Sequence, residues 1–369
     1  KMIALNRRDF RKILLVFSSY DAYIMEQGGS LTSRIVSEYR GLNLSHPPRL
    51  IRVSSAAAAL ALLAETKFDL VIITPQLDDM DCFALGRAIK VIDKKIPIIL
   101  LSHNVKDIGM FSPLDKAAGI ARFYIWSSNP DFLMALVKNV EDHLNVAHDT
   151  KTAMVRVLIL VEDSPLYLSS FLGLIYKEIV KQTQALLDES LTDEHRLLKM
   201  RARPKILVAR NYEEALRLYK EFRPYVFGII SDTRFPRNGK SDSRAGISLL
   251  SHIRADISDL PLLMLSAEPV NRELAEQIPA VFVDKNSTAL LNKIQDFFVR
   301  HLGFGNFVFR LPDGSEVDRA DSLKTFETKL AQIPDDALLY HAENNHFFNW
   351  VMARSEIALA SLLHKDRFK

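Results

Sequence analysis

The chain has 369 residues, enough for two or three domains of ordinary size. Its 48 basic and 45 acidic residues leave a net charge of +3, so no strong electrostatic field favours binding to nucleic acid or to an anionic membrane. The single cysteine, Cys82, excludes an internal disulfide framework, and no apolar run approaches the ~20 residues that cross a bilayer. We therefore expect a soluble, cytoplasmic protein.

Aliphatic strands alternate with helices over residues 10–148. The strands are predicted in KILLVF, LIRV, LVIIT, IPIILLS and RFYIW, each short and continuously apolar. Helices are predicted over Tyr20–Arg40 and Ala56–Glu65, and a closing helix follows the fifth strand. Residues 145–153 are polar and small, and are interpreted as a linker or a frayed helix end.

The same order of elements returns over residues 154–302, with strands in VRVLILV, KILVA, VFGIIS, PLLMLS and AVFV. Two insertions distinguish this second series. Its first helix, which starts at Pro165, is predicted to run on as far as Arg203, and a polar stretch, RNGKSDSR, lengthens the loop after Asp232. Such a pattern predicts two doubly wound α/β domains, each built on a five-stranded parallel sheet.

The pattern changes over residues 303–369. The PDGSE turn predicts a short hairpin, and helices are predicted to start near Ser322 and Asp335, so this extension is mainly helical. His341 and His346 admit a metal or phosphohistidine interpretation, but aromatic helix packing is favoured because no carboxylate or cysteine completes a compact motif.

Reactive side chains follow four strands of the second series. Because ligands bind at the carboxyl ends of strands in doubly wound sheets, these side chains are expected to meet. Carboxylates gathered there predict a Mg²⁺ site, with a lysine to neutralise a phosphoryl group and a hydroxyl to donate to one of its oxygens. Asp232 is the predicted nucleophile. The five residues are Glu162, Asp163, Asp232, Ser266 and Lys285.

With these five residues in this order along the chain, residues 155–302 resemble the receiver domain of two-component response regulators, which has a flavodoxin-like fold. The match includes Pro236, four residues after Asp232, and Phe282, three before Lys285. The resemblance implies that Asp232 accepts a phosphoryl group from a sensor histidine kinase or phosphotransfer protein. Mg²⁺ would be held by Glu162, Asp163, Asp232 and the backbone carbonyl of Arg234. Ser266 and Phe282 would form the switch pair.

Two positions depart from the family's pattern. Asn286 stands where the family usually has a proline after the lysine, so the expected cis peptide is in doubt. Arg234 stands two residues beyond the acceptor, where we expect a long cation to slow hydrolysis of the acyl phosphate.

The first series lacks the reactive residues at its strand ends. Two carboxylates, the nucleophile and the lysine are all absent there, so we expect a pseudo-receiver kept for packing against the second domain or a partner. The residues at the corresponding positions are Phe17, Ser18, Thr74, Ser102 and Trp126.

The tail carries a narrower resemblance. GFGNFVFR and YHAENNHFFNWVMARSEIALA look like the segment that joins paired receivers to a PEP synthase-like, PEP/pyruvate-binding module in large bacterial proteins. This implies a downstream effector fused beyond Lys369, and the chain is then a fragment. No recognition helix for DNA is evident in the tail, so we expect no direct nucleic-acid binding and no membrane contact, while homodimerisation is left open.

Three functions compete. A regulatory phosphoacceptor, which is not an enzyme in the ordinary sense, is favoured. A tandem scaffold that never turns over phosphate is the second. An aspartate-nucleophile phosphatase of the haloacid dehalogenase type is the third, but that family has its nucleophile first and a second Asp where this chain has Arg234.

Overall fold

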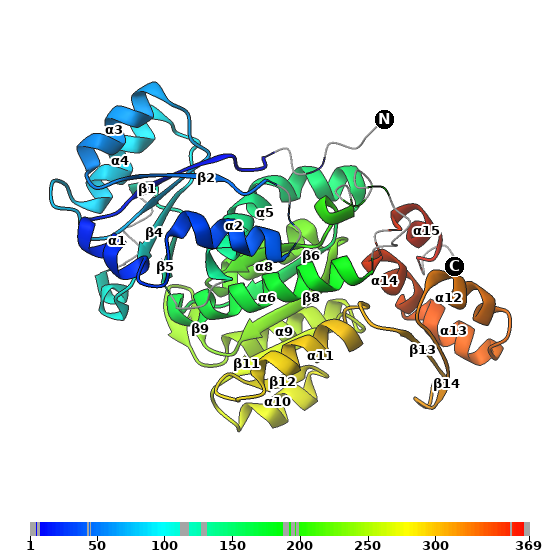
Figure 1. Ribbon diagram of the computed structural model, residues 1–369. Coiled ribbons are helices and arrows are strands. Elements are labelled where there is room, and N and C mark those ends of the chain that lie inside the picture. The colour runs from blue at the N-terminus through cyan, green and yellow to red at the C-terminus, as the bar shows by residue number, and fades with distance from the viewer. Residues whose placement is uncertain are drawn as a thin grey trace. The chain divides into compact units, whose positions relative to one another are not determined.

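The computed structural model describes residues 5, 8–42, 44, 46–110, 118–126, 131–186, 192, 196, 199–354 and 356–364. The described residues contain two five-stranded parallel sheets and a smaller C-terminal lobe (Figure 1). No described helix is both long enough and apolar enough to pass through a bilayer.

The first sheet has the strand order β2-β1-β3-β4-β5, with every neighbouring pair parallel. Its central strands are wholly buried, which explains why they are continuous aliphatic runs instead of alternating ones. The strands are β1 Lys12–Val16, β2 Arg49–Val53, β3 Leu70–Ile73, β4 Ile98–Ser102 and β5 Arg122–Ile125.

The helices around this sheet largely follow the prediction, with one correction. The helix expected over Tyr20–Arg40 is two helices, because Gly29 has a φ of +115° and Ser30 caps a new start. Ser55 caps the alanine-rich helix as predicted. The helices are α1 Ser19–Met25, α2 Leu31–Gly41, α3 Ala56–Glu65, α4 Cys82–Ile92, the 3₁₀ helix η1 Val105–Met110 and α5 Phe132–Ala153.

Helix α5 decides between the two interpretations of residues 145–153, since it continues through them without a break: they are the end of a helix and not a linker. The polar residues there are partly buried. Asp149 and Lys205 are both fully buried and form an ion pair, with Oδ2 and Nζ 3.2 Å apart. Because the Asp149 carboxylate has a buried partner of opposite charge, this polar segment can lie in the core.

The second sheet repeats the topology of the first, in the order β12-β11-β8-β6-β7 and parallel throughout. In both sheets the first strand of the series lies between the second and the third, so the order reverses beside it. The strands are β6 Val157–Val161, β7 Lys205–Ala209, β8 Val226–Asp232, β11 Leu262–Ser266 and β12 Val281–Asp284.

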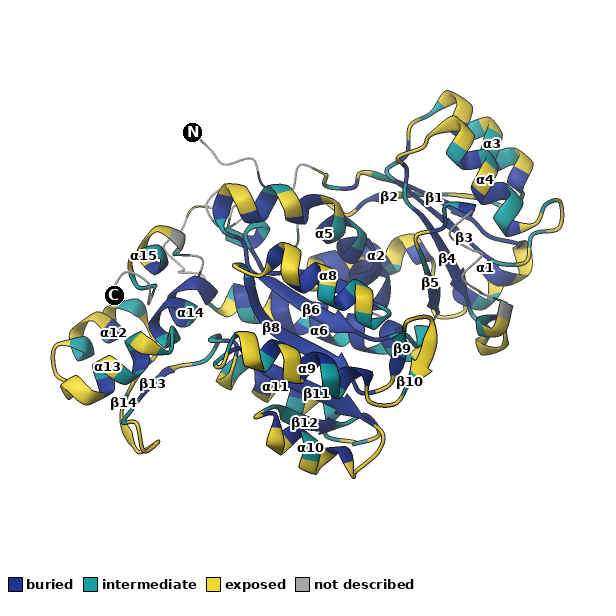
Figure 2. Cartoon of the chain, turned by 180° about the vertical axis from the view of Figure 1, so that it is seen from behind, coloured by how far each residue is buried: buried dark blue, intermediate teal, exposed yellow. Residues whose placement is uncertain are grey.

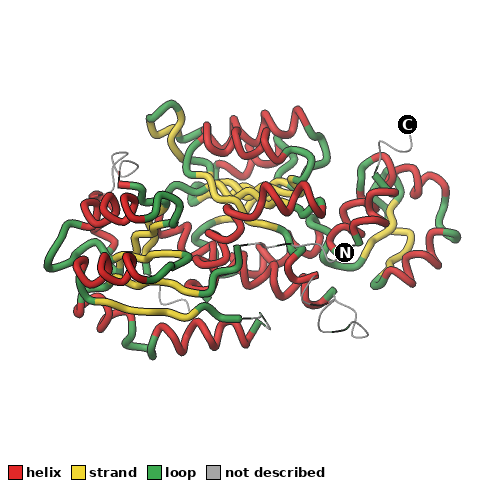
Figure 3. Tube along the Cα trace, turned by 90° about the horizontal axis from the view of Figure 1, so that it is seen from above, coloured by secondary structure: helices red, strands yellow, loops and turns green. Residues whose placement is uncertain are grey.

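Helices cover both faces of the second sheet (Figure 3). Apolar residues of α8 and α9 pack with the sheet in one core cluster, and both helices lie in front of the sheet in Figure 2. Helix α11 lies in front of the sheet in Figure 1, which shows the opposite side. The buried strands and exposed outer helix faces in Figure 2 match the amphipathic pattern of the sequence. The helices are α6 Pro165–Ala185, α8 Tyr212–Phe222, α9 Ala245–Asp256, α10 Asn271–Gln277 and α11 Leu290–Arg300.

The polar insertion after Asp232 folds as a small antiparallel hairpin of β9 Phe235–Arg237 and β10 Lys240–Asp242. Its turn is formed by Asn238 and Gly239, with φ values of 52° and 74°, as a two-residue turn that matches strand twist requires. The Arg237 guanidinium lies 4.3 Å from the centre of the Tyr212 ring, which attaches the hairpin to the start of α8.

The chain divides into two compact units. One comprises Lys1–Asn6, Asn145–Asp163 and Glu178–Lys369, and the other comprises Arg7–Leu144 and Ser164–Lys177. Helix α6 therefore contributes residues to both. It ends at Ala185, and most of its predicted continuation towards Arg203 lies outside the described residues.

The C-terminal lobe packs a hairpin and four helices around an aromatic core. Phe307, Phe326 and Trp350 are each at most 5% exposed, and their rings lie 4.9–5.7 Å apart, centre to centre. The predicted hairpin and the helix starts near Ser322 and Asp335 are both present. The elements are β13 Phe307–Arg310, β14 Glu316–Ala320, α12 Leu323–Leu330, α13 Asp335–Glu343, α14 His346–Ala353 and α15 Ile357–Leu362.

His341 belongs to this aromatic core. Its Nε2 accepts a hydrogen bond from the Arg310 backbone N–H at 2.7 Å, and its Nδ1 lies 2.9 Å from Nδ1 of His346. Burial, then His346 and Arg310, lower the pKa of His341 to about 3. The imidazole is therefore a neutral acceptor within the core.

We expect the C-terminal lobe to lose stability in acid because of His341. The unfolded imidazole binds a proton below about pH 6.5, whereas the folded one stays neutral down to about pH 3. The free energy of unfolding should therefore decrease as the pH falls through this window. Urea unfolding at neutral pH and near pH 5 measures the decrease. In His341→Gln, which keeps an acceptor but does not titrate, the decrease should be smaller; an equal decrease would contradict this role.

Candidate functional site

The proposed acceptor, Asp232, is the last residue of β8 and lies at the carboxyl edge of the second sheet. Six apolar or small residues precede it in a wholly buried strand, so the strand fixes its position while its side chain is only 12% exposed. Its Oδ1 accepts a hydrogen bond from the Thr233 backbone N–H at 2.6 Å. One carboxylate oxygen is thus oriented by the next residue of the chain.

Two further acids come from the end of β6, which neighbours β8. The Glu162 N–H continues the pairing of β6 with β7 by donating to the Ala209 carbonyl at 3.0 Å. Carboxylate oxygens of Glu162, Asp163 and Asp232 all lie within 4.8 Å of one another. Across the described residues, no other group of three acidic, His or Cys side chains comes this close together.

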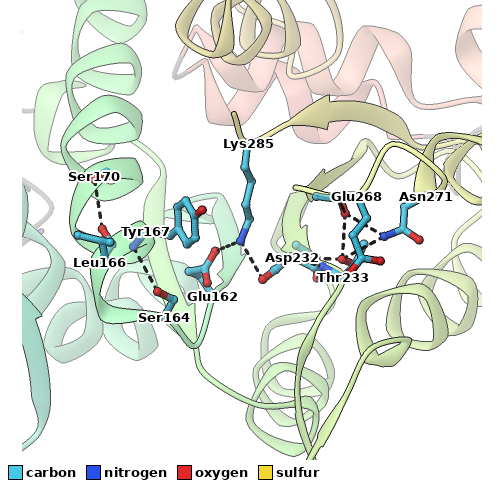
Figure 4. A network of polar contacts seen from close by, with 12 residues as sticks. Glu162, Ser164, Leu166, Tyr167, Ser170, Asp232, Thr233, Glu268, Asn271 and Lys285 are labelled. Atoms are coloured by element: carbon cyan, nitrogen blue, oxygen red, sulfur yellow. Dashed lines mark hydrogen bonds and ion pairs between the residues drawn. The ribbon is translucent and has the colours of Figure 1, made fainter. Parts of the chain in front are cut away.

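Lys285 follows β12, and its side chain points toward Glu162 and Asp232 (Figure 4). Its Nζ lies 2.6 Å from Oε2 of Glu162 and 2.8 Å from Oδ2 of Asp232. Burial alone lowers the pKa of Lys285, but the carboxylates of Glu162 and Asp232 outweigh it, and the net shift is upward. The ammonium is therefore charged at neutral pH.

This donor set fits a hard divalent cation. Three carboxylates and one ammonium leave a formal charge of −2 (−3 + 1) in the group formed by Glu162, Asp163, Asp232 and Lys285. Oxygen ligands are those that Mg²⁺ prefers. The Arg234 carbonyl, the fourth ligand expected from the sequence, stays a prediction.

Hydrogen bonds through Thr233 join Ser266 to Asp232. The Ser266 Oγ lies 3.2 Å from Oγ1 of Thr233 and accepts a hydrogen bond from Nδ2 of Asn271 at 2.8 Å. Thr233 and Asn271 are 4% and 5% exposed, and the sequence-based reasoning missed both of them. A hydroxyl directly after the acceptor was the available signal for Thr233.

Gly246, near the start of α9, is a further residue that was missed. Its N–H donates to the Thr233 carbonyl at 3.0 Å, and a Cβ built on it would lie 2.0 Å from the Asp232 carbonyl oxygen. Only a glycine lets α9 approach the acceptor's backbone this closely.

Three other predicted residues surround this edge of the sheet. Arg234 forms an exposed ion pair with Glu268, 2.9 Å between Nη2 and Oε1. The Arg272 guanidinium lies 4.9 Å from the centre of the half-buried Phe282 ring. The peptide bond between Lys285 and Asn286 is trans.

The first sheet presents an equivalent edge. The Phe17 N–H donates to Val53 at 3.1 Å, as Glu162 does to Ala209, and the Trp126 N–H donates to Ser102 at 2.6 Å, as Lys285 does to Ser266. The backbone therefore places Phe17 where the second sheet has Glu162, and Trp126 where it has Lys285.

Side chains at this first edge satisfy one another. Ser18 caps α1 and donates to Asp21 at 2.7 Å, and its own N–H donates to Thr74 at 3.4 Å. Ser102 donates to Asp107 at 2.5 Å. Asp21, which also lies 3.0 Å from His103, was not anticipated from the sequence. The polar side chains at this edge are therefore already engaged with one another.

Trp126 is half-buried at the first edge. Its ring meets Phe132 edge to face at 6.2 Å, and the Arg34 guanidinium lies 5.6 Å from its centre. The indole of Trp126 adds apolar packing surface at the position where the second domain has the ammonium group of Lys285.

Comparison with known protein families finds no matching family, and comparison with curated proteins finds no relative. Solved receiver domains are similar in structure at low sequence identity. The receiver domain of a Pseudomonas aeruginosa PAO1 sensor histidine kinase, with a magnesium ion in its active-site cleft, has 17% identity over 35% of this chain and 96% of its own, with a TM-score of 0.26.

Two response regulators give comparable values. The Vibrio cholerae chemotaxis response regulator CheY4 has 18% identity over 36% of this chain and 99% of its own, with a TM-score of 0.28. The phosphorylated cyanobacterial phytochrome response regulator RcpA has 21% identity over 36% and 93%, with a TM-score of 0.27.

Proposed function

We propose that the second domain, residues 154–302, is a receiver in which Asp232 accepts a phosphoryl group. The observation that carries the proposal is the placement of Asp232 between two further carboxylates and a lysine, at the carboxyl edge of a doubly wound sheet. These groups supply a nucleophile, a cation site and a fixed positive charge together.

The transfer is a displacement at phosphorus. A carboxylate oxygen of Asp232 forms the new P–O bond, and the bond between phosphorus and the donor breaks with its electron pair going to the donor. Lys285, whose Nζ lies 2.8 Å from Oδ2 of the attacking carboxylate, supports the negative charge of the transferring phosphoryl group. Bound Mg²⁺, held by Glu162, Asp163, Asp232 and the Arg234 carbonyl, would supply further positive charge to the phosphoryl oxygens.

In the cell, a sensor histidine kinase or phosphotransfer protein would be the donor. Phosphorylated Asp232 would shift a two-state equilibrium, and Ser266 and Phe282 would pass the change on. In this proposal residues 10–148 form a pseudo-receiver that acts by contact, and residues 303–369 connect to an effector.

We expect the protein to gain the mass of one phosphoryl group when it is incubated with Mg²⁺ and acetyl phosphate. Asp232→Asn should show no gain, because the amide is not a nucleophile. Asp296→Asn removes an exposed carboxylate on α11 and should gain as the wild type does. Intact mass spectrometry measures all three proteins. A wild type that takes up no phosphoryl group from acetyl phosphate or a kinase would favour the scaffold function instead.

A further inference from the structure

A large cavity lies at the amino edge of the second sheet, the edge opposite the acceptor. Its volume is about 1180 Å³, and it is lined by the starts of β11 and β12, the end of α11 and the C-terminal lobe, all of one compact unit. The Trp350 indole N–H donates to the Gly305 carbonyl at 2.8 Å, and Nη2 of Arg354 donates to the same carbonyl at 3.0 Å. These bonds hold the lobe against the segment that follows α11, so the cavity has fixed walls.

Positive side chains dominate the lining of this cavity. Four arginines but only one acid, Asp259, are among its described lining residues. Two of the arginines, Arg300 and Arg319, have an acidic neighbour on their own element. The other two, Arg254 and Arg310, donate to neutral backbone carbonyls at 2.6–3.0 Å, and neither forms an ion pair with a described carboxylate. The cavity therefore offers positive charge to a ligand.

His346, which also lines the cavity, presents a hydrogen-bond donor without a partner. Because Nε2 of His341 accepts from the Arg310 backbone N–H, the proton of the neutral His341 ring is on Nδ1. That proton is donated to Nδ1 of His346, 2.9 Å away. Burial lowers the pKa of His346, so this ring is also neutral and carries its one proton on Nε2. Within the described residues, nothing accepts a hydrogen bond from this Nε2–H.

The unused donors belong to one group of side chains around His341. The Arg310 guanidinium is near enough to help lower the pKa of His341, and the His346 ring centre is 5.1 Å from that of His341. The Tyr340 ring lies 5.4 Å from the His346 ring, and its hydroxyl has no partner among the described residues. A cation, an imidazole N–H and a phenol therefore line the same part of the cavity.

We propose that this cavity binds a phosphate group, carried by a small molecule or as free phosphate, with Arg310, Tyr340 and His346 as its ligands. A phosphate has several strong acceptor oxygens that point in different directions, which suits donors from separate side chains. The volume leaves room for an organic part beside the phosphate. The site lies at the sheet edge opposite Asp232 and does not require phosphorylation of that residue, so it goes beyond the proposed function.

Calorimetric titration of the full, unphosphorylated chain tests the site, with AMP, inorganic phosphate and uncharged adenosine as probes. The buffer contains no Mg²⁺, so that the carboxylates around Asp232 repel phosphate. We expect saturable binding of AMP and phosphate but not of adenosine. Tighter binding of AMP than of phosphate would identify an organic phosphate as the ligand class, and equal affinities would identify phosphate itself. No saturable binding of either anion would overturn the proposal.

Arg310→Gln should weaken binding of the anionic probes by about tenfold or more, because a hydrogen bond to a charged group is lost. Arg217→Gln, which changes an exposed arginine on α8, is the matched control and should bind as the wild type does. Equal affinity of Arg310→Gln and the wild type would contradict the site.

The side-chain signal of His346 gives a readout that does not depend on a substitution in the site. Proton–nitrogen correlation spectra of the imidazole rings should show His346 protonated on Nε2, with His346→Gln identifying the signal. This signal should shift as AMP or phosphate is added. A His346 signal that stays unchanged at saturation would overturn the site, while the proposed function of Asp232 would be unaffected.

Discussion

Lys285→Met is expected to lower the free energy of unfolding by about 3–5 kcal/mol and to abolish phosphoryl acceptance. Lys285 is 4% exposed and contacts Glu162, which is fully buried, as well as Asp232. Methionine keeps much of the volume but leaves two carboxylates without their cation. The same substitution removes the charge that supports the transferring phosphoryl group. Urea unfolding and intact mass after acetyl phosphate treatment measure the two effects.

Lys220→Met, on the exposed face of α8, is the control and should change neither quantity by much. The dependence of the unfolding free energy on pH in the alkaline range gives a second check. Because the pKa of Lys285 is raised in the folded protein, its contribution to stability is complete below the ordinary value of about 10.4 and is lost as the pH rises through the folded value. The methionine variant should lack this loss, and wild-type stability in the variant would contradict the ion-pair account.

Gly246→Ala is expected to impair the site without changing any charged group. The new Cβ would lie 2.0 Å from the Asp232 carbonyl oxygen and 2.8 Å from Cα of Thr233. Both contacts are with backbone, so α9 or the acceptor loop must shift. We expect a loss of about 1–3 kcal/mol in unfolding free energy and a large fall in the rate of phosphorylation, because the acceptor's backbone is displaced.

Gly41→Ala is the matched control for Gly246→Ala. Gly41 ends α2, and a Cβ there would have no neighbour within 4 Å. Alanine should therefore be neutral or slightly stabilising at this position. Chemical unfolding and the time course of phosphoryl uptake compare the variants; an unimpaired Gly246→Ala protein would contradict the close approach of α9.

Much of the fold could be predicted because parallel strands buried on both faces must be apolar throughout. The failures have local and long-range causes. Gly29 splits a helix whose apolar pattern runs across it, and a positive φ is a backbone property that periodicity does not show. The polar end of α5 is helical, and its Asp149 pairs with Lys205, more than fifty residues away along the chain.

The reactive groups of the site were accessible to sequence reasoning because each follows a predicted strand. Parallel strands end at one edge, so their order alone brings Asp232 near Glu162 and Lys285. Asn271 and Gly246 belong to helices, and their roles depend on how α9 and α10 approach that edge. Helix placement of this precision follows from packing, which a strand pattern does not contain.

The unequal repeat of the chain gives the central claim: two sheets share one topology, and the chemistry belongs to the second. Phosphoryl stoichiometry tests this most directly, measured on the full chain with Mg²⁺ and a phosphodonor and then located by peptide mapping. We predict at most one phosphoryl group per chain, on the peptide that contains Asp232. A phosphoryl group within residues 10–148, or one that persists in Asp232→Asn, would contradict the claim.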